Sequence, residues 1–399
     1  MKIPITKPFI GEEERKAILE PLATGWIVQG PQVAEFEQSF SEFTKAKYAI
    51  ATTSCTTALH LSLVALGIGA GDEVILPSFT FVATANAVEY TGATPLFCDI
   101  DLCTFNIDVE QIEKKMTNRT KAILPVHLFG LSADINAIMK IAQRHRLRII
   151  EDAACGLGSY YQGKHVGTFG KTGCFSFHPR KAITTGEGGM IITEDESVMM
   201  TLKSLRDHGA TKTDLDRHVD RGGSLLPAFN RLGFNYRMTD IQGALGVAQM
   251  KSATKIIEAR KARAERYDQL LKGEEWLKIP ECPDGNIHSY QSYVCMIKPK
   301  GYSFGIEEFS LEKVSLFNKK RNQLMEILWT KGIGIRQGTH AVHHLGYYRE
   351  KYGLRPEDYL YSLIAEQWSI TLPLYAQMTD EEQDFVVKEL KLCAESLEF

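Results

Sequence analysis

The stretch CFSFHPRKAITTGEGG, at residues 174–189, contains the most informative residue of the chain, Lys181. Lys181 follows an apolar run and opens a turn rich in threonine and glycine, which leads into a second apolar run at residues 190–193. An ammonium group between two buried strands needs a partner or a task, because lysine is almost never buried alone. A lysine amine held there can form an imine with an aldehyde. The stretch therefore indicates covalent chemistry at Lys181.

Short apolar runs alternate with helical windows on both sides of this stretch. Leu59, Leu63 and Leu66 recur at helical spacing, as do Ile135 and Ile138. Strands that alternate with helices favour an α/β fold with a mostly parallel sheet flanked by helices, in which ligands collect at the carboxyl ends of the strands. The chain predicts seven strands, at residues 48–52, 73–77, 94–99, 121–127, 147–152, 172–178 and 189–193.

The rest of the chain predicts a second, smaller α/β domain. Residues 238–272 contain no proline and favour one long helix. A strand at 292–297, a helix at 318–329 and a last helix from Asp380 to about Ser396 follow, and Thr379 with Glu382 forms a capping box for that last helix. We therefore expect a large domain at 1–250 and a small domain at 251–399. Residues 299–317 have too weak a pattern to assign.

Composition narrows the class of protein. The net charge of −3 leaves no electrostatic footprint for nucleic acid or an anionic membrane. The eight cysteines form no C-x-x-C pair and no zinc-finger spacing, which suits free thiols in a reducing compartment. Prolines stand where a signal peptide needs an apolar run, and no stretch approaches the roughly 18–20 apolar residues that cross a bilayer. We expect a cytoplasmic enzyme without nucleic-acid or membrane partners.

Four further motifs accompany the Lys181 stretch in a fixed order. Lys181 lies about 29 residues after Asp152. The motifs are TSCTTALH at 53–60, PSFTFVATAN at 77–86, IIEDAAC at 149–155 and LGFNYRMTD at 232–240. With these motifs the chain resembles the DegT/DnrJ/StrS aminotransferases, which have fold type I of the pyridoxal 5'-phosphate (PLP) enzymes, the aspartate aminotransferase-like fold. The resemblance extends from Gly25 to Tyr375.

The resemblance implies a covalent cofactor, PLP, on Lys181, with pyridoxamine phosphate as the intermediate. When the amino donor displaces Lys181 from the cofactor, the freed lysine would move the proton between the donor α-carbon and the cofactor carbon. Thr56, Thr57 and Ser176 would bind the phosphate, and the helix that the 53–60 motif opens supports this because helix N-termini attract anions. Asn235 would reach the phosphate of the neighbouring subunit, which implies a homodimer with shared sites.

Three more positions would contact the ring or the substrate. Asp152 would pair with the protonated pyridine nitrogen, and Phe81 would lie flat against the ring. Cys155 would approach the ring oxygen, where many relatives have glutamine or histidine, and a thiol is a weaker hydrogen-bond partner than either. His340 would lie near the sugar or its nucleotide.

Each motif also has a simpler structural interpretation. The threonines of 53–60 can be a helix cap, Phe81 an ordinary core residue, and Asp152 a cap for the next turn beside a Glu151 without special role. Residues 235–240 can be a turn and a helix cap. The three histidines at 340, 343 and 344 lack a partnered carboxylate signature, so we expect solvated loop residues and no metal site.

The combined pattern predicts a PLP-dependent aminotransferase that moves an amino group from glutamate to a nucleotide-linked 3- or 4-keto sugar, for a polysaccharide or an antibiotic sugar. Three alternatives remain open. Some relatives are PLP-dependent sugar dehydratases, but those have usually lost the lysine that is present here as Lys181. Others aminate cyclitols or form aminohydroxybenzoate, so a non-nucleotide ring is possible as substrate. The last alternative is a regulatory homologue without turnover.

Overall fold

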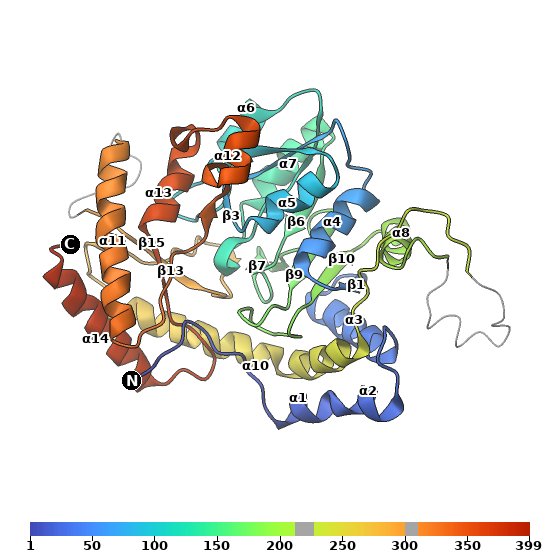
Figure 1. Cartoon of the computed structure of the whole chain (residues 1–399), viewed down its shortest axis with the longest axis horizontal. Coiled ribbons are helices and arrows are strands. Elements are labelled where there is room, and N and C mark those ends of the chain that lie inside the picture. The colour runs from blue at the N-terminus through green and yellow to red at the C-terminus, as the bar shows by residue number, and fades with distance from the viewer. Residues whose placement is uncertain (212–226, 300–309) are drawn as a thin grey trace.

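A seven-stranded sheet forms the centre of the large domain (Figure 1). The structure is a computed structural model that describes residues 1–211, 227–299 and 310–399. All neighbouring strands are parallel except the two pairs that β10 forms with β1 and β9. In spatial order the strands are β1 (Tyr48–Thr52), β10 (Gly189–Thr193), β9 (Thr172–Ser176), β6 (Arg148–Asp152), β5 (Thr120–Ile123), β2 (Glu73–Pro77) and β4 (Thr94–Cys98). All seven predicted strands are confirmed. The bounds of β1, β2 and β10 match the expected ones, and those of the other four strands differ by a few residues at one or both ends.

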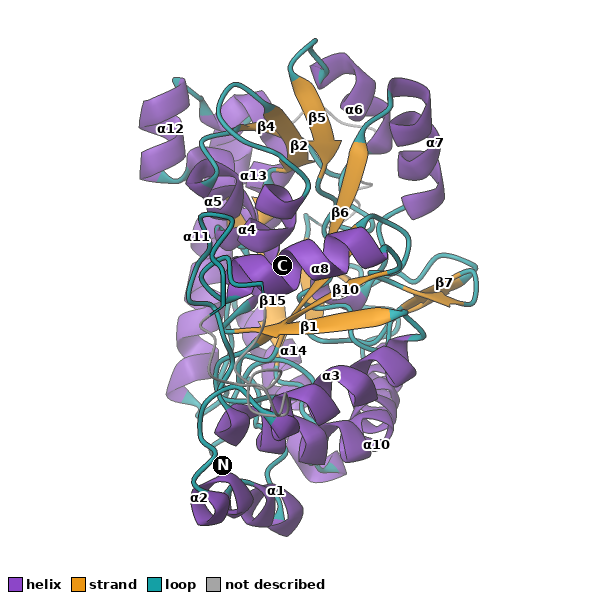
Figure 2. Ribbon diagram, turned by 90° about the vertical axis from the view of Figure 1, so that its right-hand side faces the viewer, coloured by secondary structure: helices purple, strands orange, loops and turns teal. Residues whose placement is uncertain are grey.

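Helices cover both faces of this sheet because successive side chains of each strand point to opposite sides. Val74 and Ile150 pack against α4 (Cys55–Ala65), α5 (Ala83–Tyr90) and α8 (Glu196–Arg206). On the other face, Ile75 and Ile149 pack against α6 (Val109–Lys115) and α7 (Ile135–His145). At the β1 end that face is covered by α3 (Pro31–Thr44) and α10 (Asp240–Leu270), and Figure 2 shows β1 between α8 and these two helices.

The long helix α10 joins the two parts of the chain. It matches the helix expected at 238–272, and the boundary expected at residue 250 lies inside it. Its first half packs into the large-domain core through Val247 and Ile256, and its second half packs into the small-domain core through Ala264 and Tyr267. The N-terminal helices α1 (Glu12–Ala17) and α2 (Leu19–Thr24) lie along its first half (Figure 1).

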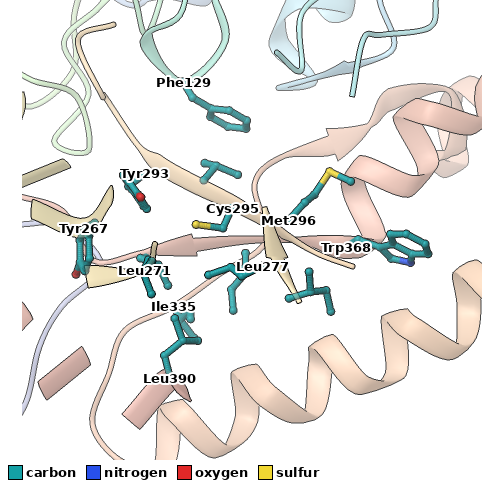
Figure 3. Close-up of a cluster of buried hydrophobic side chains, with 14 of the residues drawn as sticks. Phe129, Tyr267, Leu271, Leu277, Tyr293, Cys295, Met296, Ile335, Trp368 and Leu390 are labelled. Atoms are coloured by element: carbon teal, nitrogen blue, oxygen red, sulfur yellow. The ribbon is translucent and has the colours of Figure 1, made fainter. Parts of the chain in front are cut away.

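The small domain has a three-stranded antiparallel sheet of β11 (Leu277–Lys278), β13 (Tyr293–Ile297) and β15 (Ser369–Leu372). It packs on α11 (Leu311–Thr330), α13 (Leu360–Trp368) and α14 (Asp380–Ser396). The capping box at Thr379 is confirmed, since its hydroxyl accepts the amide of Glu382. Figure 3 shows the core of this domain, in which Phe129 of the large domain lies close to Tyr293 and Met296. The two domains therefore share one continuous core.

The helix expected at 318–329 begins earlier, at Leu311, with Ser310 as its N-cap. Its first turns belong to the weakly patterned stretch, where exposed Leu311 and Leu316 obscure the period of the buried Val314 and Phe317. Residues 300–309 of that stretch lie outside the described residues.

The remaining elements are short. They are β3 (Phe79–Thr80) paired with β14 (His340–Ala341), the sheet of β12 (Asn286–Ile287), β7 (Tyr160–Tyr161) and β8 (Lys164–His165), and the helix α12 (Gly346–Tyr352). Among the described residues, no helix combines the length and the apolar character that crossing a membrane requires.

Candidate active site

The register of three strands brings the TSCTTALH motif at 53–60 and the Lys181 stretch at 174–189 together. Thr52 of β1 lies opposite Gly189 of β10, and Gly189 lies opposite Ser176 of β9. Gly189 is required here, because a Cβ at this position would lie 2.4 Å from the carbonyl carbon of Ser54. The segment that leads into α4 therefore rests directly on β10, beside Ser176.

The N-terminus of α4 presents both predicted threonines at this edge. Ser54 is the N-cap, with its hydroxyl 3.2 Å from the amide of Thr57. The Thr57 hydroxyl donates to the Ser54 carbonyl oxygen at 2.7 Å, and Thr56 is partly exposed. The helix-cap interpretation is thus correct for Ser54 and Thr57. It is compatible with anion binding, because the positive end of α4 faces the same edge.

Hydrogen bonds from three directions fix the loop that carries Lys181. Within the loop, the Lys181 amide donates to the carbonyl of His178 at 2.8 Å. From α10, the Gln249 side chain accepts the amide of Thr184 at 3.1 Å. From the small domain, the Gln291 side chain donates to the carbonyl of Arg180 at 2.9 Å. The position of the lysine is therefore set by elements on both sides of the domain boundary.

Lys181 and Cys155 are in direct contact. The Lys181 Nζ lies 3.1 Å from the Cys155 Sγ and donates a hydrogen bond to it. Both side chains are partly buried, and Cys155 follows β6 by three residues. The structure thus brings together the Lys181 amine and the Cys155 thiol.

Asp152 is a buried carboxylate at the end of β6, held by two donors. The Thr84 hydroxyl donates to its Oδ2 at 2.8 Å, and the Ala154 amide donates to its Oδ1 at 3.1 Å. Because Thr84 donates to Asp152, the 2.9 Å contact between the hydroxyls of Thr80 and Thr84 requires Thr80 to be the donor. Burial raises the pKa of Asp152, although Thr84, the Ala154 amide and Lys181 all favour the carboxylate.

Phe81 lies between these two threonines in sequence, and its ring is 63% exposed. The interpretation of Phe81 as an ordinary core residue is therefore wrong. The exposed ring lies three residues before Thr84, whose hydroxyl donates to the buried Asp152.

These residues fit PLP as a group. A buried acid such as Asp152 is stabilised by a cation, which a protonated pyridine provides. The exposed face of Phe81 suits a flat aromatic ring, and the Lys181 amine suits its aldehyde. The start of α4 and Ser176 offer the hydroxyl and amide donors that a phosphate needs.

His340 lies next to this group through the pairing of β14 with β3. In this pairing His340 lies opposite Thr80, and Thr80 is the residue before Phe81. Its Nδ1 lies 3.5 Å from a carboxylate oxygen of Glu366, and the Nδ1 of His344 lies 3.5 Å from the other oxygen. In the part of the chain that the structure describes, no three His, Cys, Asp or Glu side chains are arranged to hold a metal ion.

The expectation of solvated histidines is wrong for His343. Its side chain is buried, its Nδ1 accepts from the Ser78 hydroxyl at 2.6 Å, and its Nε2 donates to the Pro356 carbonyl at 3.1 Å. Burial lowers its pKa to about 4. His343 therefore joins the end of β2 to the segment after α12.

The Asn235 side chain makes no hydrogen bond to the other candidates within one chain, all of which the structure describes, although its segment contacts the 53–60 motif. The backbone of Asn235 bridges to Asp207, and the carbonyl of the next residue, Tyr236, accepts the amide of Thr53 at 3.1 Å. The side chain of Asn235 is exposed. The helix-cap interpretation is correct for Thr239, which caps α10.

Glu151 has a role that the sequence did not reveal. Its fully buried carboxylate accepts the amides of Gly167, Phe169 and Gly170 at 2.6–2.7 Å and the Nε2 of His127 at 2.8 Å. These donors keep the pKa of Glu151 low despite its burial. Because Asp152 points to the other face of β6, Glu151 anchors the loops behind the strand that carries the candidate acid. An acid inside an apolar strand was the only signal for this role.

We predict that Glu151→Gln lowers the free energy of unfolding by about 3–5 kcal/mol, because an amide nitrogen would replace one oxygen and face two donors. Chemical denaturation would measure the change. Glu113→Gln is the matched control, since Glu113 forms exposed ion pairs with Arg144 and His145 and should cost about 1 kcal/mol or less. Equal losses for both variants would contradict the anchoring role.

Comparison with known proteins agrees with this site. The model of the DegT/DnrJ/EryC1/StrS aminotransferase family matches residues 8–391. The spore coat polysaccharide biosynthesis protein SpsC of Bacillus subtilis is 36% identical over 389 residues, covering 98% of this chain and 96% of SpsC.

Two solved structures share the fold over nearly the whole chain. Helicobacter pylori PseC, an aminotransferase involved in the biosynthesis of pseudoaminic acid, has a TM-score of 0.88 at 28% identity, covering 99% of this chain and 100% of PseC. NtdA of Bacillus subtilis, solved with bound cofactor PMP, has a TM-score of 0.80 at 30% identity, covering 97% of this chain and 83% of NtdA. Fold type I is thereby confirmed, the cofactor is PLP, and the enzyme is an aminotransferase. The chain belongs to the DegT/DnrJ/EryC1/StrS family of PLP-dependent sugar aminotransferases.

Proposed function

We propose that this enzyme transfers the amino group of glutamate to a nucleotide-linked 3- or 4-keto sugar. The observation that carries the proposal is the Lys181 amine, held by its loop at 3.1 Å from Cys155 beside the buried Asp152. The names of its relatives support a sugar as acceptor: SpsC belongs to polysaccharide biosynthesis and PseC to pseudoaminic acid biosynthesis.

Each candidate residue has a proposed task. PLP supplies the electron sink that stabilises negative charge at the donor α-carbon. Lys181 binds the cofactor covalently and, when released, moves a proton on its Nζ between the donor carbon and the cofactor carbon. The negative charge of Asp152 keeps the pyridine nitrogen protonated, and Phe81 covers the ring and excludes water.

The remaining candidates bind and orient the cofactor and the substrate. Thr56, Thr57 and Ser176 bind the phosphate at the start of α4, and Cys155 contacts the ring oxygen and the lysine. His340, which lies opposite Thr80 in the β14–β3 pair, faces the sugar substrate.

We also propose a homodimer in which Asn235 completes the phosphate site of the partner. Its exposed side chain supports this, as does a set of large apolar side chains that are 48–89% exposed: Leu19, Leu22, Ile27, Val28, Phe229 and Leu232. Such side chains mark surfaces that a partner covers. All eight cysteines are free, which supports a cytoplasmic location.

An absorption experiment tests the proposed function. The purified protein with added PLP should show the visible band of a lysine-bound cofactor, and excess glutamate should shift the band to shorter wavelength. Nucleotide-linked 3-keto and 4-keto sugars would then be screened for return of the band. A band that responds to other amino donors but not to glutamate would contradict glutamate as the donor. A band restored only by cyclitol ketones would contradict a nucleotide-linked sugar as the acceptor.

A further inference from the structure

A small pocket next to the Lys181 loop contains two arginines. Arg180 precedes Lys181, and Arg336 lies on an extended segment that pairs with Thr371 of β15. Gln291 and Ser292, just before β13, form another wall. The two guanidinium groups and the side-chain amide of Gln291 suit a small anion such as a carboxylate.

The charges of this pocket are unbalanced. Among the described residues, neither Arg180 nor Arg336 has a carboxylate within ion-pair distance, and neither guanidinium makes a hydrogen bond. The Nε of Arg336 is buried without a partner. Arg180 is exposed and Arg336 is partly buried, whereas the fully buried arginines are paired: Arg206 with Glu37 at 2.5 Å, and Arg321 with the carbonyl of Ser369 at 2.7 Å.

An unpaired, partly buried guanidinium is costly, because a buried donor without an acceptor has given up its hydrogen bonds to water and gained none in return. Burial and the neighbouring Arg180 both lower the pKa of Arg336. An anion in the pocket would remove both penalties. Guanidinium groups bind carboxylates through two parallel hydrogen bonds, which gives strength and orientation.

The pocket lies next to the reactive amine. Arg180 is the immediate neighbour of Lys181, and its carbonyl is held by Gln291, which also lines the pocket. Cys155, which contacts the Lys181 Nζ at 3.1 Å, is close enough to Arg336 to influence it electrostatically. A carboxylate bound in this pocket therefore lies beside the loop that carries Lys181.

We propose that Arg180 and Arg336 bind a carboxylate of the amino-acid donor in this pocket. The inference rests on the proposed function, since it assumes an amino acid as donor, but not on the identity of the keto acceptor. It assigns donor recognition to the Lys181 loop and the small domain, apart from the cofactor-binding residues at α4, β6 and Phe81.

Arg336→Gln tests this assignment in the first half-reaction alone. With the PLP-loaded protein, the glutamate concentration that gives half the maximal rate of band loss should rise about 10- to 100-fold, as expected for one lost charged hydrogen-bond pair. The dissociation constant of PLP and the visible band should remain unchanged. Arg349→Gln, at an exposed position of α12, is the matched control and should leave both values unaltered. A half-saturating concentration within twofold of the parent, with an intact band, would overturn the proposal.

Two further measurements sharpen the test, and the first, made in the parent enzyme, keeps it decisive if the variant folds poorly. In the parent enzyme, glutarate, a dicarboxylate without an amine, should compete with glutamate, and its neutral diamide should not. Equal effects of both compounds would overturn the proposal. Comparing glutamate with glutamine as donors in Arg336→Gln identifies the carboxylate that is bound. If the half-saturating concentration rises for both donors, the arginines bind the α-carboxylate. If it rises for glutamate alone, they bind the side-chain carboxylate. If the parent protein forms no band with PLP, the proposed function fails before this test begins.

Discussion

Replacing Lys181 with alanine is expected to abolish multiple-turnover transamination while PLP still binds without a covalent bond. The variant loses both the amine that joins the cofactor and the base that moves the proton. Proton transfer by a placed base alone is worth about 10²- to 10⁴-fold, so a fall in kcat of at least about 10³-fold is expected. Steady-state turnover and borohydride trapping of PLP on the protein would measure the two losses separately.

Lys171→Ala is the matched control for Lys181→Ala. Lys171 is exposed and only 4.0 Å from Asp195 in a weak surface pair, so its loss should change neither activity nor trapping. Retained multiple turnover in Lys181→Ala, with PLP still trapped by borohydride at another lysine, would refute the assignment. Complete loss of PLP binding would show that PLP needs the bond to Lys181 in order to bind, and the role of the lysine in proton transfer would then need a separate test.

The same variant tests the shared site. We expect that mixing inactive Lys181→Ala chains with inactive Asn235→Asp chains, followed by dissociation and reassociation, restores activity. In a mixed dimer one site would carry both defects and the other none. If mixing restores nothing, Asn235 acts within its own chain or not at all.

Local pattern was sufficient to predict the strands and their order of appearance. Short continuous apolar runs and terminal turns define β1, β2 and β10 to the residue, because each strand is buried on both faces and lies between clear breaks. The start of α11 was missed because exposed Leu311 and Leu316 obscure the helical period there. Local signals therefore succeed where burial is uniform and fail where a helix is only partly covered.

The partners of single side chains could not be predicted, because they depend on residues distant in sequence. Glu151 is bound by the loop at 167–170 and by His127, and only the fold brings these donors to one strand. The pairing of His340 with Thr80 and the pocket of Arg180 and Arg336 likewise join the two domains. Sequence motifs indicated which residues carry chemistry, whereas the surrounding charges that set their behaviour follow from tertiary structure.

The second large effect is expected for Asp152→Asn, which should weaken PLP binding and slow the half-reaction with glutamate by about 10²- to 10³-fold. Removing one member of a buried charge pair costs about 2–5 kcal/mol. Here the lost charge is the one that we propose keeps the pyridine nitrogen protonated. Equilibrium dialysis with PLP and stopped-flow absorbance with glutamate would measure the two effects.

The hydrogen bonds around Asp152 make this substitution specific for charge. An asparagine Oδ1 can still accept the Ala154 amide, as the carboxylate does at 3.1 Å. Its Nδ2 would face Thr84, and the hydroxyl chain can reverse, so that Thr84 accepts from Asn and donates to Thr80. The fold should therefore survive, with little change in the melting temperature of the apo-protein. Thr84→Val, which removes one donor but keeps the charge, should cost only about 10-fold. If Asp152→Asn matches the parent in PLP affinity and rate, the acid serves only the turn that follows β6.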